Sequence, residues 1–136
     1  MRRFVALVLC LGLAGCGGIK TYPVNGTVIY AESNQPAKDL VGYSVTLEPE
    51  NPAEDGKKHS AIGLIGQDGS FTVSTFAHGD GALGGKHKVA ITPPVPSGDV
   101  VIKSILPARF ADLQQSGLII SVESGKAEVK LTVSKK

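Results

Sequence analysis

The fold class of this chain is decided by one stretch, Ser60-Ala61-Ile62-Gly63-Leu64-Ile65-Gly66-Gln67-Asp68-Gly69-Ser70-Phe71-Thr72-Val73-Ser74-Thr75. Two short runs rich in apolar residues, 60–65 and 71–75, flank the polar segment Gln67–Ser70. Asp-Gly between two such runs is a strong signal for a β-hairpin, because the turn needs residues that accept a positive φ. The stretch therefore predicts two strands joined by a tight turn.

A period of two continues on both sides of this hairpin. Apolar residues alternate with polar ones in five further runs: 24–30, 43–48, 88–92, 118–122 and 129–133. Such alternation is typical of strands that bury one face, and Ser124-Gly125 between the last two runs predicts a second tight hairpin. Seven short strands separated by turns predict an all-β fold, a single seven-stranded antiparallel β-sandwich.

The segments between the strands differ in character. Glu50–Lys58 is charged and is expected to be solvated, whereas His78–Gly85 is rich in Gly and Ala. Pro93–Pro96 is expected to be extended, because each proline fixes its own φ and restricts the residue before it. Ala108–Gln115, which follows a proline, is the nearest candidate for one or two helical turns. We expect the loops His78–Gly85 and Pro93–Asp99 to form the contact surface for partners.

The amino terminus has the features of an export signal. Arg2 and Arg3 precede an unbroken apolar run, Phe4–Leu13. This run is too short to span a bilayer as a helix, which needs about 20 residues. A positive start, a short apolar run and small residues after it are typical of a secretory signal peptide.

The end of this segment, Leu13-Ala14-Gly15-Cys16, resembles the lipobox of bacterial lipoproteins. The resemblance implies cleavage between Gly15 and Cys16, a diacylglycerol on the Cys16 sulfur and acylation of the new amino group. The chain then divides into a signal peptide (1–15), a lipidated cysteine with a short tether (16–22) and a β-domain (23–136). An ordinary secretory signal, cut after Ala14 or Gly15, remains the alternative.

Processing would change the charge and thiol content of the chain. The precursor has 14 Lys and Arg against 12 Asp and Glu, and loss of Arg2 and Arg3 makes the two numbers equal. The processed chain therefore lacks the basic excess of a nucleic-acid-binding protein. Cys10 would leave with the signal and Cys16 would carry lipid, so no thiol remains for a disulfide, a metal or a nucleophile. Gly17 after the cysteine favours the outer over the inner membrane.

Four segments, behind a lipobox, resemble motifs of small bacterial lipoproteins of the planctomycete type that carry a carboxypeptidase-regulatory-like, transthyretin-like domain. The segments are Pro23–Val28, Gly63–Val73, Asp80–Val89 and Leu106–Leu118. The chain departs from the family pattern where Ile65-Gly66 replaces Thr-Asp and where His87 and Phe110 replace Tyr. The resemblance implies a prealbumin-like or Ig-like sandwich of unassigned role, with no catalytic residues and no cofactor. We therefore expect a non-catalytic envelope module whose partners are membrane lipid, through Cys16, and envelope proteins.

The histidines supply the alternative function. A zinc site needs three or four converging ligands, and His59, His78 and His87 lie at neither helical nor strand spacing, although His78 and Asp80 could ligate from one loop. The chain has no Gly-x-Ser-x-Gly motif and no spacing typical of a calcium loop. The alternative is thus a small transthyretin-like hydrolase or metal-dependent enzyme that uses the three histidines. We predict no catalytic, cofactor-binding or metal-binding residue.

Overall fold

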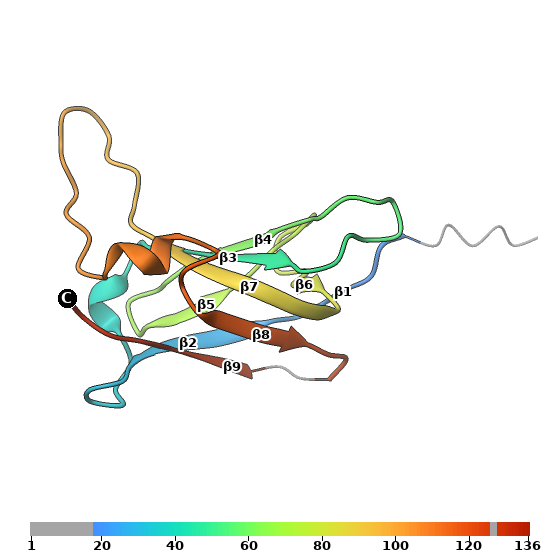
Figure 1. Cartoon of the computed structure of the whole chain (residues 1–136), viewed down its shortest axis with the longest axis horizontal. Coiled ribbons are helices and arrows are strands. Elements are labelled where there is room, and N and C mark those ends of the chain that lie inside the picture. The colour runs from blue at the N-terminus through green and yellow to red at the C-terminus, as the bar shows by residue number, and fades with distance from the viewer. Residues whose placement is uncertain (1–17, 126–127) are drawn as a thin grey trace, which may run out of the picture.

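The computed structural model describes residues 18–125 and 128–136 (Figure 1). The signal segment 1–15 and the cleavage and lipidation positions Gly15 and Cys16 lie outside the described residues. Within the described ranges the secondary structure consists of nine strands and two short 3-10 helices. This confirms the all-β prediction. No helix in these ranges is long and apolar enough to cross a membrane.

The strands fall into three sheets. The four-stranded sheet has the order β4-β3-β7-β8, the three-stranded sheet has the order β5-β2-β9, and β1 pairs with β6. The elements are β1 (Thr21–Tyr22), β2 (Asn25–Tyr30), η1 (Lys38–Leu40), β3 (Ser44–Pro49), β4 (Ala61–Leu64), β5 (Ser70–Thr72), β6 (Ala82–Leu83), β7 (Gly85–Thr92), η2 (Ala108–Ala111), β8 (Leu118–Val122) and β9 (Glu128–Val133).

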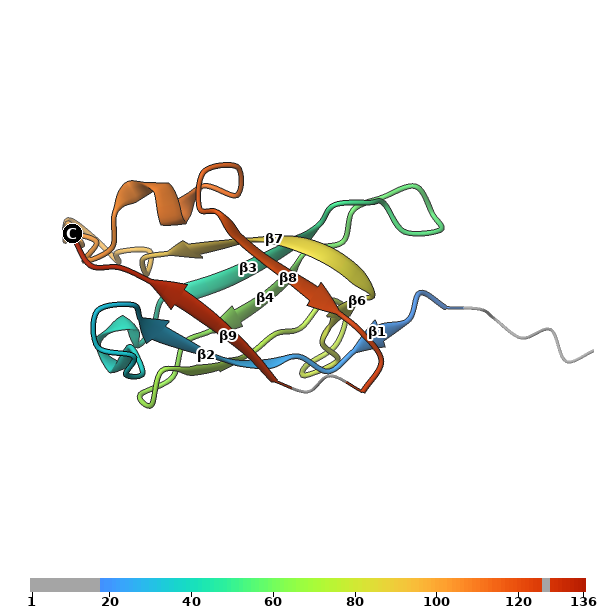
Figure 2. The same cartoon turned by 60° about the horizontal axis from the view of Figure 1, so that its bottom comes forward.

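The two larger sheets lie face to face and share one apolar core (Figure 2). Alternate residues of each strand face inward, as the period of two predicts. Val28 of the three-stranded sheet and Leu47 and Val89 of the four-stranded sheet are completely buried. Burial of one such side chain contributes about 1.5–3 kcal/mol, so these inward faces hold the two sheets together.

A glycine in β2 makes room for the largest side chain of β5. A Cβ atom at Gly26 would lie 2.2 Å from Cζ of Phe71. The two residues are opposite one another in the antiparallel β2–β5 register, and Phe71 is buried. The absence of a side chain at position 26 therefore lets the phenyl ring lie across the strand and fill the core.

The strand pairing differs from the single antiparallel sandwich that the sequence predicts. All seven predicted strands are present, but β1 and β6 add a third sheet. The prediction that all pairing is antiparallel is wrong, because β2 and β9 pair in parallel from Asn25↔Glu128 to Tyr30↔Val133. The hairpin predicted at Ser124-Gly125 is also wrong: β8 pairs with β7, whereas β9 pairs with β2. Turn residues allow the chain to change direction, but they do not determine which strand β9 joins. β9 pairs with β2 because the apolar faces of β8 and β9 are then both buried between the two sheets.

The predicted tether and the predicted helical segment each contain one short element of secondary structure. Thr21 and Tyr22, which the sequence places at the end of the tether, form β1 and pair with Leu83 and Ala82 of β6. The predicted helical segment after Pro107 contains the single 3-10 turn of η2. Its Phe110 is buried, so this short helix covers the outer side of β7.

Candidate functional site

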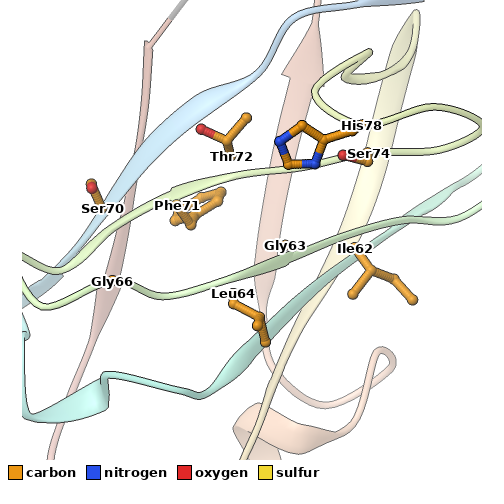
Figure 3. A pocket seen from close by; sticks show the side chains of 9 residues that line it. All are labelled: Ile62, Gly63, Leu64, Gly66, Ser70, Phe71, Thr72, Ser74 and His78. Carbon is orange, nitrogen blue, oxygen red and sulfur yellow. The ribbon is translucent and has the colours of Figure 1, made fainter.

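An open groove of about 510 Å³ lies between β4 and β5 (Figure 3). These strands are joined by the predicted turn, in which Gly69 has a φ of 82° and the Gly66 N–H donates to the Ser70 carbonyl at 2.8 Å. Beyond the turn, β4 pairs with β3 and β5 pairs with β2. A single isolated bridge between Ile62 and Ser74 connects the β4 segment to the β5 segment. The groove thus lies where the edges of the two sheets diverge.

The two walls of the groove differ in chemistry. Ile62 and Leu64 form an aliphatic wall and are 53% and 65% exposed. Figure 3 places them on one side of the two strands, with Thr72 and His78 on the other. The polar wall consists of three hydroxyls and one imidazole: Ser70, Thr72, Ser74 and His78. No lining residue carries a fixed charge.

A glycine forms the floor of the groove. A Cβ atom at Gly63 would lie 2.2 Å from the carbonyl oxygen of Thr72. The backbones of β4 and β5 can approach this closely only because position 63 has no side chain. The two backbones therefore close the bottom of the groove between its aliphatic and polar walls.

The hydroxyls of the groove already have hydrogen-bond partners: Ser70 Oγ donates to Asp68 Oδ1 at 2.6 Å and Thr72 Oγ1 donates to Asn25 Oδ1 at 2.9 Å. Ser74 Oγ accepts a hydrogen bond from the Gly79 N–H at 2.7 Å. Within the described ranges, no hydrogen bond connects His78 to Ser70, Thr72 or Ser74. A nucleophilic hydroxyl needs a general base within hydrogen-bond reach.

The three histidines lie in three different environments. His59 Nε2 is 2.7 Å from Asp55 Oδ2, and its ring meets that of Phe76 edge to face. His78 lines the groove, whereas His87 is completely buried in β7. In the part of the chain that the structure describes, no three His, Cys, Asp or Glu side chains lie close enough to hold a metal ion. The structure therefore does not bring the histidines together.

His87 is the most unusual of the three. Its Nδ1–H donates to the Gly85 carbonyl at 3.0 Å, but its Nε2 is buried with no hydrogen-bond partner among the described atoms. Burial lowers the pKa of His87 below its ordinary value, and the bond to Gly85 offsets only part of this effect. The buried imidazole of His87 is therefore neutral at pH 7.

Asp80 organises a turn. Its carboxylate accepts hydrogen bonds from the backbone N–H groups of Thr75, Phe76 and Ala77 at 2.7, 2.9 and 3.0 Å. Desolvation raises the pKa of Asp80, but these three donors outweigh it and hold the pKa below its ordinary value. The carboxylate oxygens already have partners, so the structure does not support the suggested pair of metal ligands, His78 and Asp80.

A second feature is the segment 93–104 between β7 and η2, here called the arm, which projects from the body of the protein (Figure 1). Val95 and Val101 are 92% and 91% exposed, and Val100 and Ile102 are exposed as well. Among the described residues, those from 93 to 103 take part in no hydrogen bond or ion pair. The arm therefore exposes a run of apolar side chains between the charged residues Asp99 and Lys103, and its backbone groups from 93 to 103 have no partner among the described residues.

The residues at the two ends of the arm contact the body of the protein. The Ile105 N–H donates to Tyr43 Oη at 3.1 Å, and the Ile105 carbonyl accepts the Lys136 N–H at 3.4 Å. On the other side, Pro94 Cγ lies 3.5 Å from where a Cβ of Gly42 would be. The arm thus projects from a fixed base.

The two loops predicted to form one contact surface lie at opposite ends of the protein, so that prediction is wrong (Figures 1 and 2). His78–Gly85 is at the end where β1 begins, and its Ala82 and Leu83 pair with β1. Pro93–Asp99 forms the first half of the arm at the other end. Loop composition indicates exposure but not where a loop lies in space.

Local sequence patterns do not single out Ile62, Leu64 or the second half of the arm as site residues, although each carries a signal. The run Ala61-Ile62-Gly63-Leu64-Ile65 is apolar throughout, so whichever face is buried, the other face must be apolar too. Val100-Val101-Ile102 is a β-branched run, which favours extended backbone.

The chain matches no protein-family model, no curated protein and no solved structure.

Proposed function

We propose that this protein is a lipoprotein of the bacterial cell envelope that binds an extended polypeptide segment without catalysing a reaction. Its acyl chains on Cys16 hold it in the membrane, with the outer membrane favoured over the inner. Several acyl chains give firm retention, because each buried methylene contributes about 0.8 kcal/mol. The lipobox sequence supports this part of the proposal.

The finer fold assignment belongs to the same proposal. We assign the seven longer strands to one prealbumin-like sandwich and treat β1–β6 as an accessory ribbon. The support is that β1 and β6 have two residues each and that the other seven strands share one core. In this arrangement the ribbon lies between the lipid anchor and the sandwich.

The observation that carries the binding function is the two-walled groove between β4 and β5. An extended polypeptide points alternate side chains to opposite sides. It can therefore place apolar side chains on Ile62 and Leu64 and polar ones toward the hydroxyls of Ser70 and Thr72. The groove volume of about 510 Å³ lies within the range typical of ligand sites.

Metabolic labelling with a fatty-acid analogue tests the anchoring. The wild-type chain should carry the label and sediment with membranes. The Cys16→Ala variant should carry none and leave the membrane fraction. An unlabelled wild-type chain would contradict the lipoprotein assignment.

Photo-crosslinking in the intact envelope tests the groove. A photoreactive amino acid at Leu64 should crosslink to a polypeptide. The same amino acid at Ile119 is the matched control, because Ile119 is an aliphatic residue that is 58% exposed at the opposite edge of the same sheet. Equal crosslinking at both positions, or none at Leu64, would contradict binding in the groove.

A further inference from the structure

The end of the protein at which the described chain begins is the end that a lipid on Cys16 would hold at the membrane. Gly18 follows Cys16 by only two positions. Its neighbours Ile19 and Lys20 line an open cavity of about 510 Å³ together with Pro52–Glu54 of the β3–β4 loop. The tether and this loop therefore lie side by side at one end of the molecule, and the arm lies at the other (Figure 1).

The turn formed by residues 75–80, between β5 and β6, belongs to the same end. Thr75 Oγ1 donates to the Gly81 carbonyl at 2.7 Å, and Gly81 packs against the Tyr22 carbonyl of β1. Tyr22 follows Cys16 by six positions, so the base of the 75–80 turn stays within about 20 Å of that cysteine even when the tether is fully extended. The turn is thus close to any membrane that holds the acyl chains.

Phe76 is exposed on this turn. Its side chain is 54% exposed, and no other Phe or Tyr in ranges 18–125 and 128–136 is classed as exposed. The ring is held edge to face against His59, with 5.0 Å between the ring centroids. A side chain that is already held in place loses little conformational freedom when it binds. Ala77 beside it is exposed as well, so the turn presents two neighbouring apolar side chains.

The backbone of the 75–80 turn is suited to an environment with little water. The Asp80 carboxylate accepts hydrogen bonds from the N–H groups of three consecutive residues, Thr75, Phe76 and Ala77. The Asp80 N–H donates to the Ala77 carbonyl at 3.1 Å. Moving an unsatisfied backbone group out of water is costly. These four N–H groups avoid that cost, whereas the backbone groups of the arm from 93 to 103 have no partner among the described residues.

The charges at this end suit the headgroups of zwitterionic lipids. The ammonium groups of Lys20 and Lys57 form no ion pair or hydrogen bond among the described residues, so they can meet lipid phosphates. Glu54 lines the same cavity as Lys20, and Glu50 begins the same loop as Lys57. These carboxylates can meet the ammonium group of phosphatidylethanolamine, so the charges of both signs are complementary to the headgroup layer.

We propose that the 75–80 turn rests on the membrane that holds the lipid anchor, with the phenyl ring of Phe76 among the lipid headgroups. This inference rests on the lipid anchor of the proposed function and adds a second contact with the bilayer. One aromatic ring binds a bilayer weakly, but the anchor raises its effective concentration at the surface. Two contacts fix the orientation of the domain, so the arm points away from the membrane (Figures 1 and 2).

Fluorescence in reconstituted vesicles tests this orientation. In the processed chain Cys10 is removed and Cys16 is acylated, so one introduced cysteine is the only free thiol. The full precursor is expressed, and the lipidated protein is purified in detergent and reconstituted with phosphatidylcholine and phosphatidylethanolamine. An environment-sensitive fluorophore is attached at Ala77→Cys, which leaves Phe76 in place. Val101→Cys is the matched control, because Val101 is an apolar residue of the arm that is 91% exposed.

The fluorophore at Ala77→Cys should be quenched several-fold more strongly by lipids with a nitroxide on the headgroup than the fluorophore at Val101→Cys. Its emission should also shift to shorter wavelength when vesicles are present. Phe76→Ser, introduced into the Ala77→Cys chain, should remove most of this quenching. Ile119→Ser should not, because Ile119 is equally exposed but lies on β8. Equal quenching at the two labelled positions, or quenching unchanged by Phe76→Ser, would overturn the proposed contact.

Failure of this inference can be distinguished from failure of the lipid anchor by flotation of the same vesicles. If the chain floats with the vesicles and the two labelled positions are quenched equally, the anchor stands and the membrane contact of the 75–80 turn is refuted. If the wild-type chain carries no acyl group and does not float, both are refuted.

Discussion

Gly81 lies so close to Tyr22 that a Cβ atom at position 81 would be 1.8 Å from the Tyr22 carbonyl oxygen. Gly81 has a φ of 87°, in the region that favours glycine. Immediately after it, β6 pairs with β1, the strand that contains Tyr22. Two independent constraints, backbone conformation and space, therefore require glycine where the amino-terminal strand meets the body of the protein.

Gly81→Ala should lower the free energy of unfolding by more than Gly79→Ala. Gly79 also has a positive φ of 72°, but no atom lies within 4 Å of its Cβ position. A left-handed conformation alone costs about 1–2 kcal/mol for a residue with a side chain. Gly81→Ala adds a steric clash with Tyr22, so its loss should clearly exceed this range. Urea denaturation of both variants measures the difference, and equal losses would contradict the close contact.

Asp80→Ala should destabilise the protein by about 1–3 kcal/mol, because three backbone N–H groups lose their acceptor. Asp80→Asn keeps a side-chain oxygen and should cost less. Asp99→Ala is the matched control, since Asp99 lies in the arm and forms no hydrogen bond among the described residues. Urea denaturation at neutral pH compares the three variants.

The Asp80 carboxylate should also make the free energy of unfolding depend on pH in the acid range. The pKa of Asp80 is lower in the folded protein than its unfolded value of about 3.9. Its stabilisation should be complete above that pH and should decline as the pH falls toward the folded pKa, where the carboxylate gains a proton. Asp80→Asn should reduce this decline between about pH 4 and 2. If the free energy of unfolding declined equally in acid for the wild type and for Asp80→Asn, Asp80 would not be the group responsible.

His87 should make the protein less stable in mild acid. Burial lowers its pKa, so below the ordinary pKa of about 6.5 the unfolded chain binds a proton that the folded chain does not. Stability contributed by the neutral imidazole is therefore complete above about pH 6.5 and declines as the pH falls toward the folded pKa. His87→Phe should flatten the unfolding free energy between about pH 6.5 and 5. An unchanged slope in His87→Phe would place the titrating group elsewhere.

Tyr30→Phe should cost about 1–2 kcal/mol. Tyr30 Oη donates to Asp39 Oδ1 at 2.5 Å, and Lys135 Nζ lies 2.9 Å from Asp39 Oδ2. Burial, and then the hydrogen bond to Asp39, raise the pKa of Tyr30 well above its ordinary value. Absorbance titration should accordingly lose its highest phenolate step in Tyr30→Phe. Tyr22→Phe, whose hydroxyl makes no hydrogen bond among the described residues, should change stability by less than about 0.5 kcal/mol.

The sequence predicted the strands better than it predicted their partners. Alternation identifies the inward residues of β2 and β9, such as Val28 and Leu131, because side-chain direction is a local property of a strand. It does not reveal that these two residues lie opposite one another in a parallel pair. Pairing depends on how the whole chain buries its apolar faces, and this information is not local.

The candidate site was less predictable for a similar reason. The turn at Asp68-Gly69 was expected and is present, but the groove exists because β4 and β5 then follow different sheets. The position of Asp80 suggested a metal ligand, whereas its surroundings supply three backbone donors. Sequence identified residue types that can act in a site, and only tertiary structure determined which of them meet.

The parallel pairing of β2 with β9 has a consequence for how the protein is made. The first long strand of the chain completes its sheet only when residues 128–133, near the carboxyl end, become available. Until then β2 has the three residue pairs it makes with β5 and the local bridge between Ile29 and Pro36, and the inward face of β9 is missing from the core. A nascent chain therefore cannot close its core before residues 128–133 have been synthesised. If the chain is exported as we propose, this delay would keep the polypeptide unfolded and able to pass through a translocation channel.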